Sequence, residues 1–510
     1  MRGITEEGAI AAPVDIAPVA CSRRQQLIVL TVAILGSTLG FIDGTIVAII
    51  APAIRADLGA SLATLSWVVN GYTLVLTAFI LVGGSAGDVF GRRRVFGAGI
   101  AVFAIASLGC ALVANGGQLI TARALQGFGA ALMVPSSLAL IATYYPREER
   151  GRAVGIWAAA SGVSAAIGPI LGGALVDTFG WRSTFYINLP IAGLTLWLLW
   201  AHVPDDAHRT VTQKLDWVGA LLAVAALGLL AFSLTLFGEG GELGEAISLG
   251  RPVLLGLVVL GLVAAGLFLW HEGRTSSPMM PLSMFAKPGF GAVNAATFLL
   301  YAALGGLLFF LPVTLLSAYE FSALAVGSVF LPFTVVMALI TPRVGALVDK
   351  IGVRLPLAIG AAIAGVSFWL TSVAAGTGSL IWVGGSLVVL GIGMGLCIPP
   401  LSTAIINAVS DAQSGVASGI NNAVSRAGGL FAVAAFAPLG ALAYGNSAGL
   451  PGFAVPGPTD ISAADQALHT AATLNAYSTL SYIALALGFA GAALVLIFVK
   501  STTTTRAPDG

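Results

Sequence analysis

Two charged residues lie deep inside stretches of sequence that are otherwise apolar. Asp43 lies in the run from about 27 to 54, and Arg123 lies in the run from about 118 to 143. An ionisable group inside a membrane span costs roughly 2.5–3.5 kcal/mol, so it tends to face a partner or a water-filled cavity. On helices that rise about 1.5 Å per residue, Arg123 can reach the level of Asp43. We expect the two to be electrostatic partners; a permanently paired structural acid and a snorkelling arginine are the alternatives.

A carboxyl group in this position could carry protons. Burial raises the pKa of a carboxyl group, whereas a nearby cation lowers it. A group balanced between these influences can bind and release a proton as water reaches it from alternate sides. We therefore predict that Asp43 and Arg123 form a proton-coupling site. The coupling ion would be H+, and no cofactor is expected.

Other side chains within the apolar runs are candidates for a substrate pathway. Gln126 lies one turn after Arg123 on the same helix face, where it could contact a substrate or a neighbouring helix. Asn422 and Arg426 also share a face, and they could line the pathway or bond the next helix. Tyr72 is one of several aromatic residues that could form an apolar cavity, although most such residues contact lipid or neighbouring helices.

A short polar motif occurs twice and joins long apolar segments each time. The pattern G-x-x-x-D-x-x-G, followed by basic residues, begins at Gly84 and again at Gly345, and the two copies lie 261 residues apart. Contacts of such a hairpin can form in one arrangement of two domains and break in the other, which would bias a gate. A simple topology signal is the alternative. The predicted gating residues are Gly84, Asp88, Gly91, Arg92, Arg93, Gly345, Asp349, Gly352 and Arg354.

Composition and charge place the chain in a membrane. Of its 510 residues, 57% are hydrophobic and 9% are charged, whereas a soluble protein carries about 25% charged residues. The apolar runs predict fourteen transmembrane helices. A segment that crosses lipid must satisfy its own backbone N–H and C=O groups, and a helix does so. With a cytoplasmic N-terminus, 17 of the 23 Lys and Arg residues fall on the cytoplasmic side. This positive-inside bias predicts a plasma (inner) membrane protein with both termini in the cytoplasm.

The predicted spans divide into two sets of six with two more between them. An even number of inserted helices keeps both sets in the same orientation, as in transporters built from parallel repeats. A shift of 261 residues places Leu304 opposite Asp43 and Gly384 opposite Arg123, so the repeat itself does not require either charge. The predicted boundaries are an N-terminal tail at 1–26, a six-helix bundle at 27–202, a two-helix insert with linkers at 203–285, a second six-helix bundle at 286–500 with an extracytoplasmic loop at 440–476, and a C-terminal tail at 501–510.

Five segments resemble motifs of one transporter family. The hairpin at Gly84 is similar to the cytoplasmic signature loop of the major facilitator superfamily, and 119–131 resembles its fourth-helix L-x-x-x-R-x-x-Q-G-x-G-x-A motif. The segments 42–47 and 181–190 resemble the first-helix and W-R-x-x-F-x-x-N-x-P motifs of the fourteen-helix drug:proton antiporters. A fifth segment resembles the fifth-helix antiporter motif through Gly162, Gly168, Pro169, Gly172 and Gly173. Ala48 and Val89 depart from the residues usual in these motifs.

This resemblance implies a fold and a function. The fold is an all-α polytopic membrane protein with the major facilitator fold, two six-helix bundles plus two inserted central helices. The function is alternating-access exchange of H+ for lipophilic drugs or toxic small molecules, with a tight fifth-helix seam that suppresses leak. Export of an endogenous metabolite, such as an antibiotic or siderophore, is the alternative on the same fold, and a non-transporting membrane sensor is another.

The resemblance and the composition also set the expected partners. We expect a lipophilic small molecule and the lipid bilayer, no nucleic acid, and a periplasmic adaptor with an outer-membrane channel if the host has two membranes. The sequence contains no P-loop, which argues against a built-in ATPase. The G-x-S-x-G match at 83–87 lies in a membrane helix and not in a strand–turn–helix elbow. Histidines and cysteines lack the spacing of metal ligands, so we predict no metal site. No nucleophile–base set can be assembled from the sequence either, so we do not expect an enzyme.

Overall fold

The computed structural model is a bundle of long helices. It describes residues 22–205, 215–237, 251–287, 289–319, 321–409, 413–445 and 462–499, and this part of the chain contains no strand. Thirteen of the described helices are long and apolar enough to cross a membrane. A fourteenth, α5, has 33 residues, and its apolar part runs from Ile167 to Phe179. The prediction of an all-α, multi-pass membrane protein is therefore confirmed.

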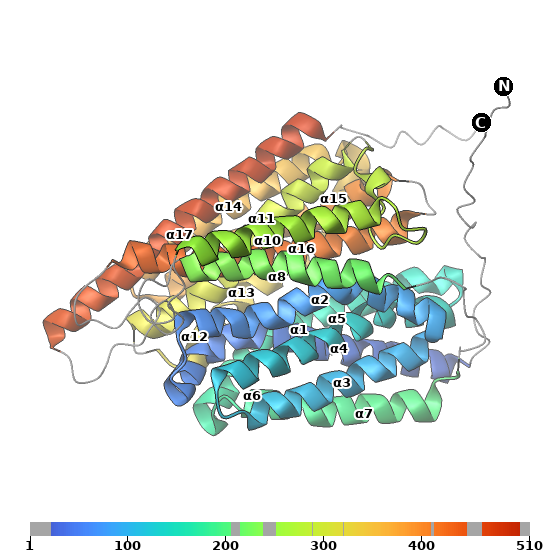
Figure 1. Ribbon diagram of the computed structural model, residues 1–510, viewed down its shortest axis with the longest axis horizontal. Helices are drawn as coiled ribbons and strands as arrows, with labels where there is room; N and C mark the ends of the chain where they lie inside the picture. The colour runs from blue at the N-terminus through green and yellow to red at the C-terminus, as the bar shows by residue number, and fades with distance from the viewer. Residues whose placement is uncertain are drawn as a thin grey trace.

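The helices form two groups with a pair between them (Figure 1). The first group is α1 (Arg23–Leu58), α2 (Leu62–Phe90), α3 (Arg92–Leu112), α4 (Gly116–Tyr144), α5 (Arg147–Phe179), α6 (Ser183–Tyr186) and α7 (Asn188–His202). The pair is α8 (Trp217–Phe237) and α10 (Arg251–Glu272), followed by the short helix η2 (Leu282–Met284). The second group is α11 (Phe290–Ala318), α12 (Ala323–Ser328), α13 (Leu331–Ile351), α14 (Arg354–Gly376), α15 (Leu380–Asn407), α16 (Ser414–Tyr444) and α17 (Ala463–Phe498).

Contacts within each group hold its helices together. In the first group, α4 packs against α2 and α3, and α1 packs against α5; in the second, α14 packs against α15 and α17, and α11 packs against α16 and α17. The α8–α10 pair contacts α2 and α16, which also contact each other. The paired inserted helices therefore lie beside the α2–α16 contact. The boundaries of the two bundles given above stay a prediction.

One close helix crossing occurs in both groups. A Cβ atom on Gly129 of α4 would overlap the backbone nitrogen of Phe103 on α3, and one on Gly393 of α15 would overlap that of Ala364 on α14. Phe103 and Ala364 lie 261 residues apart, the same interval that separates the two polar hairpins. Small residues at such crossings let helix backbones approach closely in a membrane. The structure therefore repeats a packing detail as well as a sequence motif.

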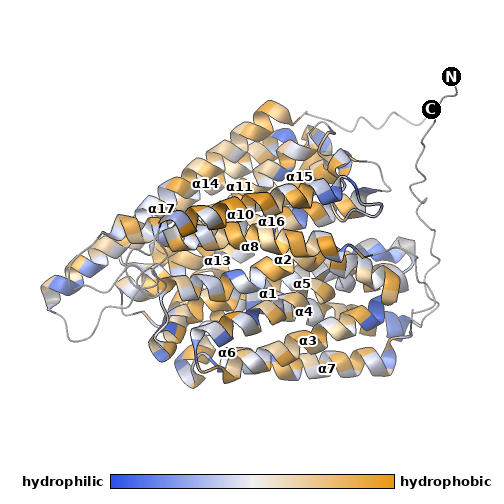
Figure 2. Cartoon of the chain, viewed as in Figure 1, coloured by the Kyte–Doolittle hydropathy of each residue, from blue (hydrophilic) through white to orange (hydrophobic). Residues whose placement is uncertain are grey.

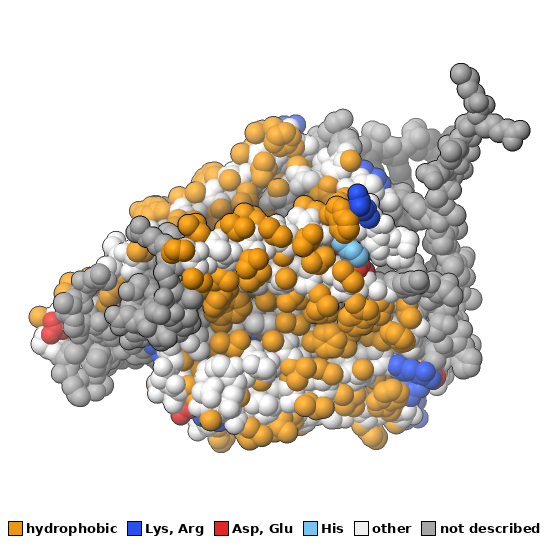
Figure 3. All heavy atoms as spheres, in the orientation of Figure 1, with side chains coloured by type: hydrophobic (Ala, Val, Ile, Leu, Met, Phe, Trp, Pro, Cys, Tyr) orange, Lys and Arg blue, Asp and Glu red, His pale blue; other side chains and the backbone are white. Residues whose placement is uncertain are grey.

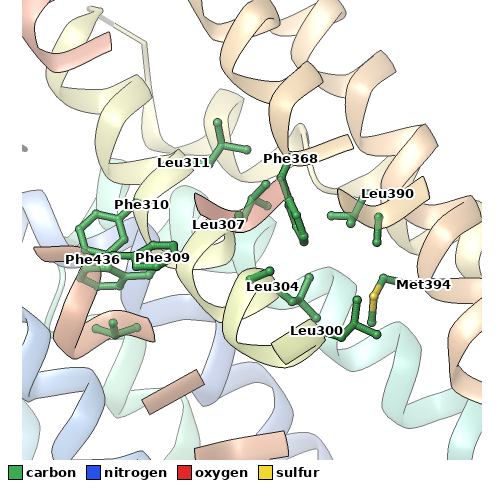
Figure 4. Packing of buried hydrophobic residues seen from close by; sticks show 14 of the residues in the cluster. Leu300, Leu304, Leu307, Phe309, Phe310, Leu311, Phe368, Leu390, Met394 and Phe436 are labelled. Carbon is green, nitrogen blue, oxygen red and sulfur yellow. The ribbon is translucent and has the colours of Figure 1, made fainter. Parts of the chain in front are cut away.

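The core of the second group is apolar. Leu300 and Leu304 of α11 lie near Phe368 of α14 and near Leu390 and Met394 of α15, and all five belong to one buried cluster (Figure 4). On the same α11 helix, Phe309 and Phe310 lie near Phe436 of α16 (Figure 4). Close packing of this kind fixes helix positions through many small dispersion contacts.

The outer surface of the helices suits a lipid environment. Hydrophobic residues cover the sides of the bundle, and charged side chains gather toward the helix ends (Figures 2 and 3). In α10 only 11% of the most apolar stretch is buried against the rest of the chain. Its exposed face includes Leu255, Val259 and Leu262. An apolar face of this size would not be stable in water.

The loop predicted at 440–476 is shorter in the structure. Helix α16 continues to Tyr444, and α17 begins at Ala463, so 463–476 is helical. The prediction relied on the Gly and Pro content of the whole segment, but its last part is rich in alanine. Ser462 also caps α17, because its side chain accepts a hydrogen bond from the backbone of Asp465. Residues 446–461, the first 21 residues of the predicted tail at 1–26, and the predicted tail at 501–510 lie outside the described residues.

Candidate functional site

An ion pair lies buried in the first group of helices. Asp43 of α1 accepts a hydrogen bond from Arg123 of α4, and each residue is only 1% exposed. Arg123 Nε also donates to the carbonyl oxygen of Val68 on α2 at 3.1 Å. The guanidinium group stacks over the ring of Tyr72, 4.4 Å from its centre. The cation is therefore held by a carboxylate, a carbonyl group and an aromatic face.

Amide and hydroxyl groups complete the surroundings of Asp43. Gln126 Nε2 donates to Asp43 Oδ1 at 2.8 Å and to Ser107 Oγ at 2.9 Å, while Gln126 Oε1 accepts from Arg123 Nη1 at 2.6 Å. Asn188 Nδ2 lies 3.2 Å from Ser107 Oγ and 3.4 Å from Asp43 Oδ1. Five helices, α1, α2, α3, α4 and α7, thus contribute to one buried polar cluster. Such a network is stable in a low-dielectric interior only when its members satisfy one another.

Two members of this cluster were not among the predicted site residues. Asn188 belongs to the W-R-x-x-F-x-x-N-x-P segment, and its position inside an apolar span was a usable signal. Ser107 of α3 lies among apolar residues and belongs to no motif, so only the packing of α3 against α4 reveals it. Gln126, predicted for the substrate pathway, is fully buried here and its amide bonds within the cluster.

The other predicted pathway residues lie beside the cluster. Asn422 and Arg426 of α16 are joined by a hydrogen bond from Arg426 Nε to Asn422 Oδ1 at 2.9 Å. Arg426 interacts electrostatically with Tyr72 of α2 and with Tyr301 of α11. Tyr72 therefore interacts with two cations, Arg123 in the first group and Arg426 in the second.

The antiporter-motif glycines lie where α5 meets α1 and α12. A Cβ atom on Gly168 would overlap Thr45, and one on Gly172 would overlap Ile46, both on α1. On the other side, a Cβ atom on Gly173 would overlap the carbonyl oxygen of Ala323 on α12. The backbone contacts are reciprocal, because a Cβ atom on Gly327 of α12 would overlap the carbonyl oxygen of Pro169. Gly162 also lies in α5, but its surroundings are not among those described.

A carboxylate strengthens the contact between α5 and α12. Asp177, near the end of α5, accepts hydrogen bonds from the backbone nitrogens of Ala323 and Leu324 at 3.3 and 3.0 Å. These nitrogens belong to the first two residues of helix α12, and the first N–H groups of a helix have no partner within it. The end of α5 and the start of α12 therefore join the two groups of helices. In the predicted topology this contact lies on the extracytoplasmic side.

The two polar hairpins turn in the same way. Gly91 and Gly352 have φ values of 94° and 78°, a conformation that favours glycine. The basic residues after them bond within their own group of helices: Arg92 donates to Thr143 at 2.5 Å and Arg93 to the Trp200 carbonyl oxygen at 2.9 Å. In the second hairpin, Arg354 donates to the carbonyl oxygen of Leu496. Gly84 and Gly345 lie in α2 and α13, and the side chains of Asp88 and Asp349 lie outside the described part.

The sequence matches the Major Facilitator Superfamily over residues 33–433. The chain belongs to this superfamily. It is 34% identical to the multidrug resistance protein Stp of Mycobacterium tuberculosis, over 79% of this chain and 73% of that protein. It is 35% identical to the cephamycin export protein CmcT of Amycolatopsis lactamdurans, over 79% of this chain and 83% of that one.

A solved structure shows the same fold. The chain resembles a bacterial homologue of the human lysosomal transporter Spinster, solved in an inward-facing and unoccupied conformation. The TM-score is 0.65 at 16% sequence identity, and the likeness covers 93% of this chain and 98% of that one. The prediction of the major facilitator fold is thus confirmed, and so is the resemblance to drug exporters of this superfamily. This chain is an efflux transporter of the major facilitator superfamily.

Proposed function

We propose that this transporter exchanges H+ for lipophilic drugs or toxic small molecules by alternating access, and that Asp43 carries the proton. The observation that supports the proposal most strongly is the buried Asp43–Arg123 pair in the first group of helices. The corresponding position in the second group holds Leu304, which packs in an apolar core (Figure 4). A costly charge that the repeated fold does not need is best explained by function.

Protonation of Asp43 would change the whole cluster. A neutral carboxyl group no longer balances the Arg123 cation, which would then lie buried without a counter-ion. Removing one member of a buried ion pair is strongly unfavourable. The protonated protein is therefore driven toward an arrangement in which Arg123 finds other partners or water. Because linkage is reciprocal, a conformation that separates the pair also binds the proton more tightly.

The contact between α5 and α12 supports a gate at the extracytoplasmic end. The α5–α12 seam and the Asp177 bonds would close the extracytoplasmic side in the present arrangement. The hairpin arginines Arg92, Arg93 and Arg354 bond within their own groups, so these bonds need not break when the cytoplasmic side opens. Substrate would then enter from the cytoplasmic side and pass Tyr72 and Arg426.

The membrane potential would supply the energy. Each charge moved across 100 mV contributes about 2.3 kcal/mol, to which a pH gradient adds. We place the transporter in the plasma (inner) membrane with both termini in the cytoplasm, as the distribution of Lys and Arg predicts. A periplasmic adaptor and outer-membrane channel stay a prediction for a host with two membranes.

Transport by the purified protein in liposomes tests this proposal. The protein is reconstituted with a pH-sensitive dye inside, and a pH gradient is imposed in the presence of lipophilic antibiotics and dyes. We expect compound movement against its gradient, with proton movement in the opposite direction, and collapse of both by a protonophore. Movement of the compound against its own gradient that persists without any proton gradient would contradict antiport.

Export of an endogenous antibiotic is the second candidate. It is favoured by the similarity to CmcT, which is named as a cephamycin export protein. A growth-inhibition panel separates the two: expression that protects against many unrelated compounds supports multidrug efflux. Protection confined to one natural product supports the dedicated exporter.

A further inference from the structure

Two carboxyl groups lie buried together where the α8–α10 pair ends. Asp216 directly precedes α8, and Glu272 is the last residue of α10. The side chain of Asp216 is 5% exposed, and Glu272 is 3% exposed. A Cβ atom on Gly219 would lie 2.6 Å from Asp216 Oδ2 and 2.7 Å from Glu272 Oε1. The two oxygens therefore flank the same small space.

The hydrogen bonds around this pair leave one oxygen of each carboxyl group without a partner. Asp216 Oδ1 accepts from the backbone of Gly219 at 2.8 Å and lies 2.8 Å from His271 Nε2. Glu272 Oε2 accepts from the backbone of Met280 at 2.9 Å. Asp216 Oδ2 and Glu272 Oε1 are buried and have no hydrogen-bond partner within the described part of the chain. Two facing carboxylate oxygens repel each other and lose water, so such a pair does not ionise fully.

Among the residues that the structure describes, which begin at Leu215 on this side of Asp216, the charged groups nearby do not supply the missing partner. Of these groups, Asp216 and His271 act on Glu272. His271 approaches Asp216 through Oδ1, on the side away from the unpartnered oxygens, and its own side chain is partly exposed. The guanidinium of Arg274 stacks on Trp270 instead, 4.8 Å from the ring centre. At this end of α10, Figure 3 shows a His side chain beside an acidic one.

We propose that Asp216 and Glu272 share one proton between Asp216 Oδ2 and Glu272 Oε1, which makes a second proton-binding site separate from Asp43. The proton comes from water on the cytoplasmic side of the predicted topology and returns there when the pair ionises. While bound, it joins the start of α8 to the end of α10. The other oxygen of Glu272 accepts from Met280 and holds that segment to the end of α10. This inference does not rest on drug transport, because it needs only the geometry of the α8–α10 pair.

The shared proton has a thermodynamic consequence. The folded protein holds a proton at a pH where isolated carboxyl groups of an unfolded chain have lost theirs. Stability therefore falls as pH rises, by about tenfold in the folding equilibrium constant for each pH unit over which this one-proton difference persists. Because α8 contacts α2 and α16, loss of the proton would loosen the insert beside the contact between the two groups.

Glu272→Gln is the informative variant. Its amide oxygen can still accept from Met280, and its NH2 group can donate to Asp216 Oδ2 without any proton. Thermal unfolding in detergent micelles is measured from mildly acidic to alkaline pH for the wild type, for Glu272→Gln and for Glu149→Gln. Glu149 is an exposed glutamate of α5, so it is a matched control for the substitution itself. We expect the wild type and the control to lose stability as pH rises, and Glu272→Gln to lose clearly less.

Infrared spectroscopy locates the proton directly and does not depend on any one variant folding. At neutral pH we expect a protonated-carboxyl C=O band that disappears on alkalinisation in the wild type and that is missing from Glu272→Gln and Asp216→Asn. It should remain in Glu149→Gln. A wild-type spectrum without a titrating carboxyl band would overturn the proposal. So would a band that both pair variants retain, or an unfolding profile that Glu272→Gln leaves unchanged.

Discussion

Leu304 on α11 packs in an apolar core of the second group of helices, whereas Asp43, 261 residues earlier on α1, lies in the buried polar cluster of the first. The interval of 261 residues between them is the one that relates the two polar hairpins. The same interval relates Ser107, a member of the polar cluster, to Phe368, which lies near Leu304 in the apolar core (Figure 4). The two halves thus share helix crossings and hairpins but differ in what fills their centres. We attribute mechanical roles to the shared features and proton chemistry to the polar centre.

The ion pair gives a prediction about stability. Arg123→Leu leaves the Asp43 carboxylate buried without its cation, and breaking a buried pair in this way costs about 3–5 kcal/mol. The double variant Asp43→Leu/Arg123→Leu removes both charges and should recover a large part of that loss. Thermal unfolding of the wild type, both single variants and the double variant measures the coupling. If the double variant is as unstable as the two single losses added together, the pair has no energetic coupling.

The α5–α12 seam gives a prediction about conformation. Gly173→Ala and Gly327→Ala each add a methyl group that overlaps a backbone carbonyl group across the seam, so the seam should open. Gly193→Ala is the matched control, because a Cβ atom there meets nothing within 4 Å. Spin labels at the exposed Phe179 and Ile381 report the distance between the two groups by pulsed EPR. We expect longer distances in both seam variants and wild-type distances in the control.

A buried asparagine gives a prediction that a substitution raises thermal stability. Asn70 of α2 is fully buried, and neither its amide oxygen nor its amide nitrogen has a partner among the residues that the structure describes. Burying an unpartnered polar group costs about 1–3 kcal/mol, so Asn70→Leu should raise thermal stability. Asn421→Leu is the control: its amide donates to Asn294 and Thr297 at 3.2 and 2.9 Å, and its loss should lower stability. A lower melting temperature for Asn70→Leu would show that Asn70 has a partner in the folded protein.

Sequence reasoning predicted the spans and the contact between Asp43 and Arg123, because a charged side chain inside an apolar run needs a partner or a water-filled cavity. It did not identify Asn188 or Ser107 as neighbours of Asp43, since their partners depend on how α3 and α7 pack. It placed Gln126 on the face of Arg123 and left open whether that face meets a substrate or a neighbouring helix, because helix periodicity does not say which helix packs against it. In the structure Gln126 bonds within the cluster, and its place in the substrate pathway stays a prediction.

Contacts between distant segments were equally hard to foresee. Asp177 lies far in sequence from the α12 backbone that it caps, and no spacing rule links them. The early start of α17 was missed for a different reason, because a Gly- and Pro-rich linker obscured the alanine-rich helix that follows Ser462. Local composition was averaged over two segments with different structures.

Proton release from energised inverted vesicles tests the central claim most directly. Lipophilic dyes and antibiotics are added to vesicles that carry the wild type, Asp43→Asn, or Asp57→Asn, an exposed acid on the same helix that pairs with Arg182. We predict substrate-dependent proton release in the wild type and in Asp57→Asn, and none in Asp43→Asn at equal levels of inserted protein. Release of the same size from Asp43→Asn would contradict the account, because the proton would then be carried elsewhere.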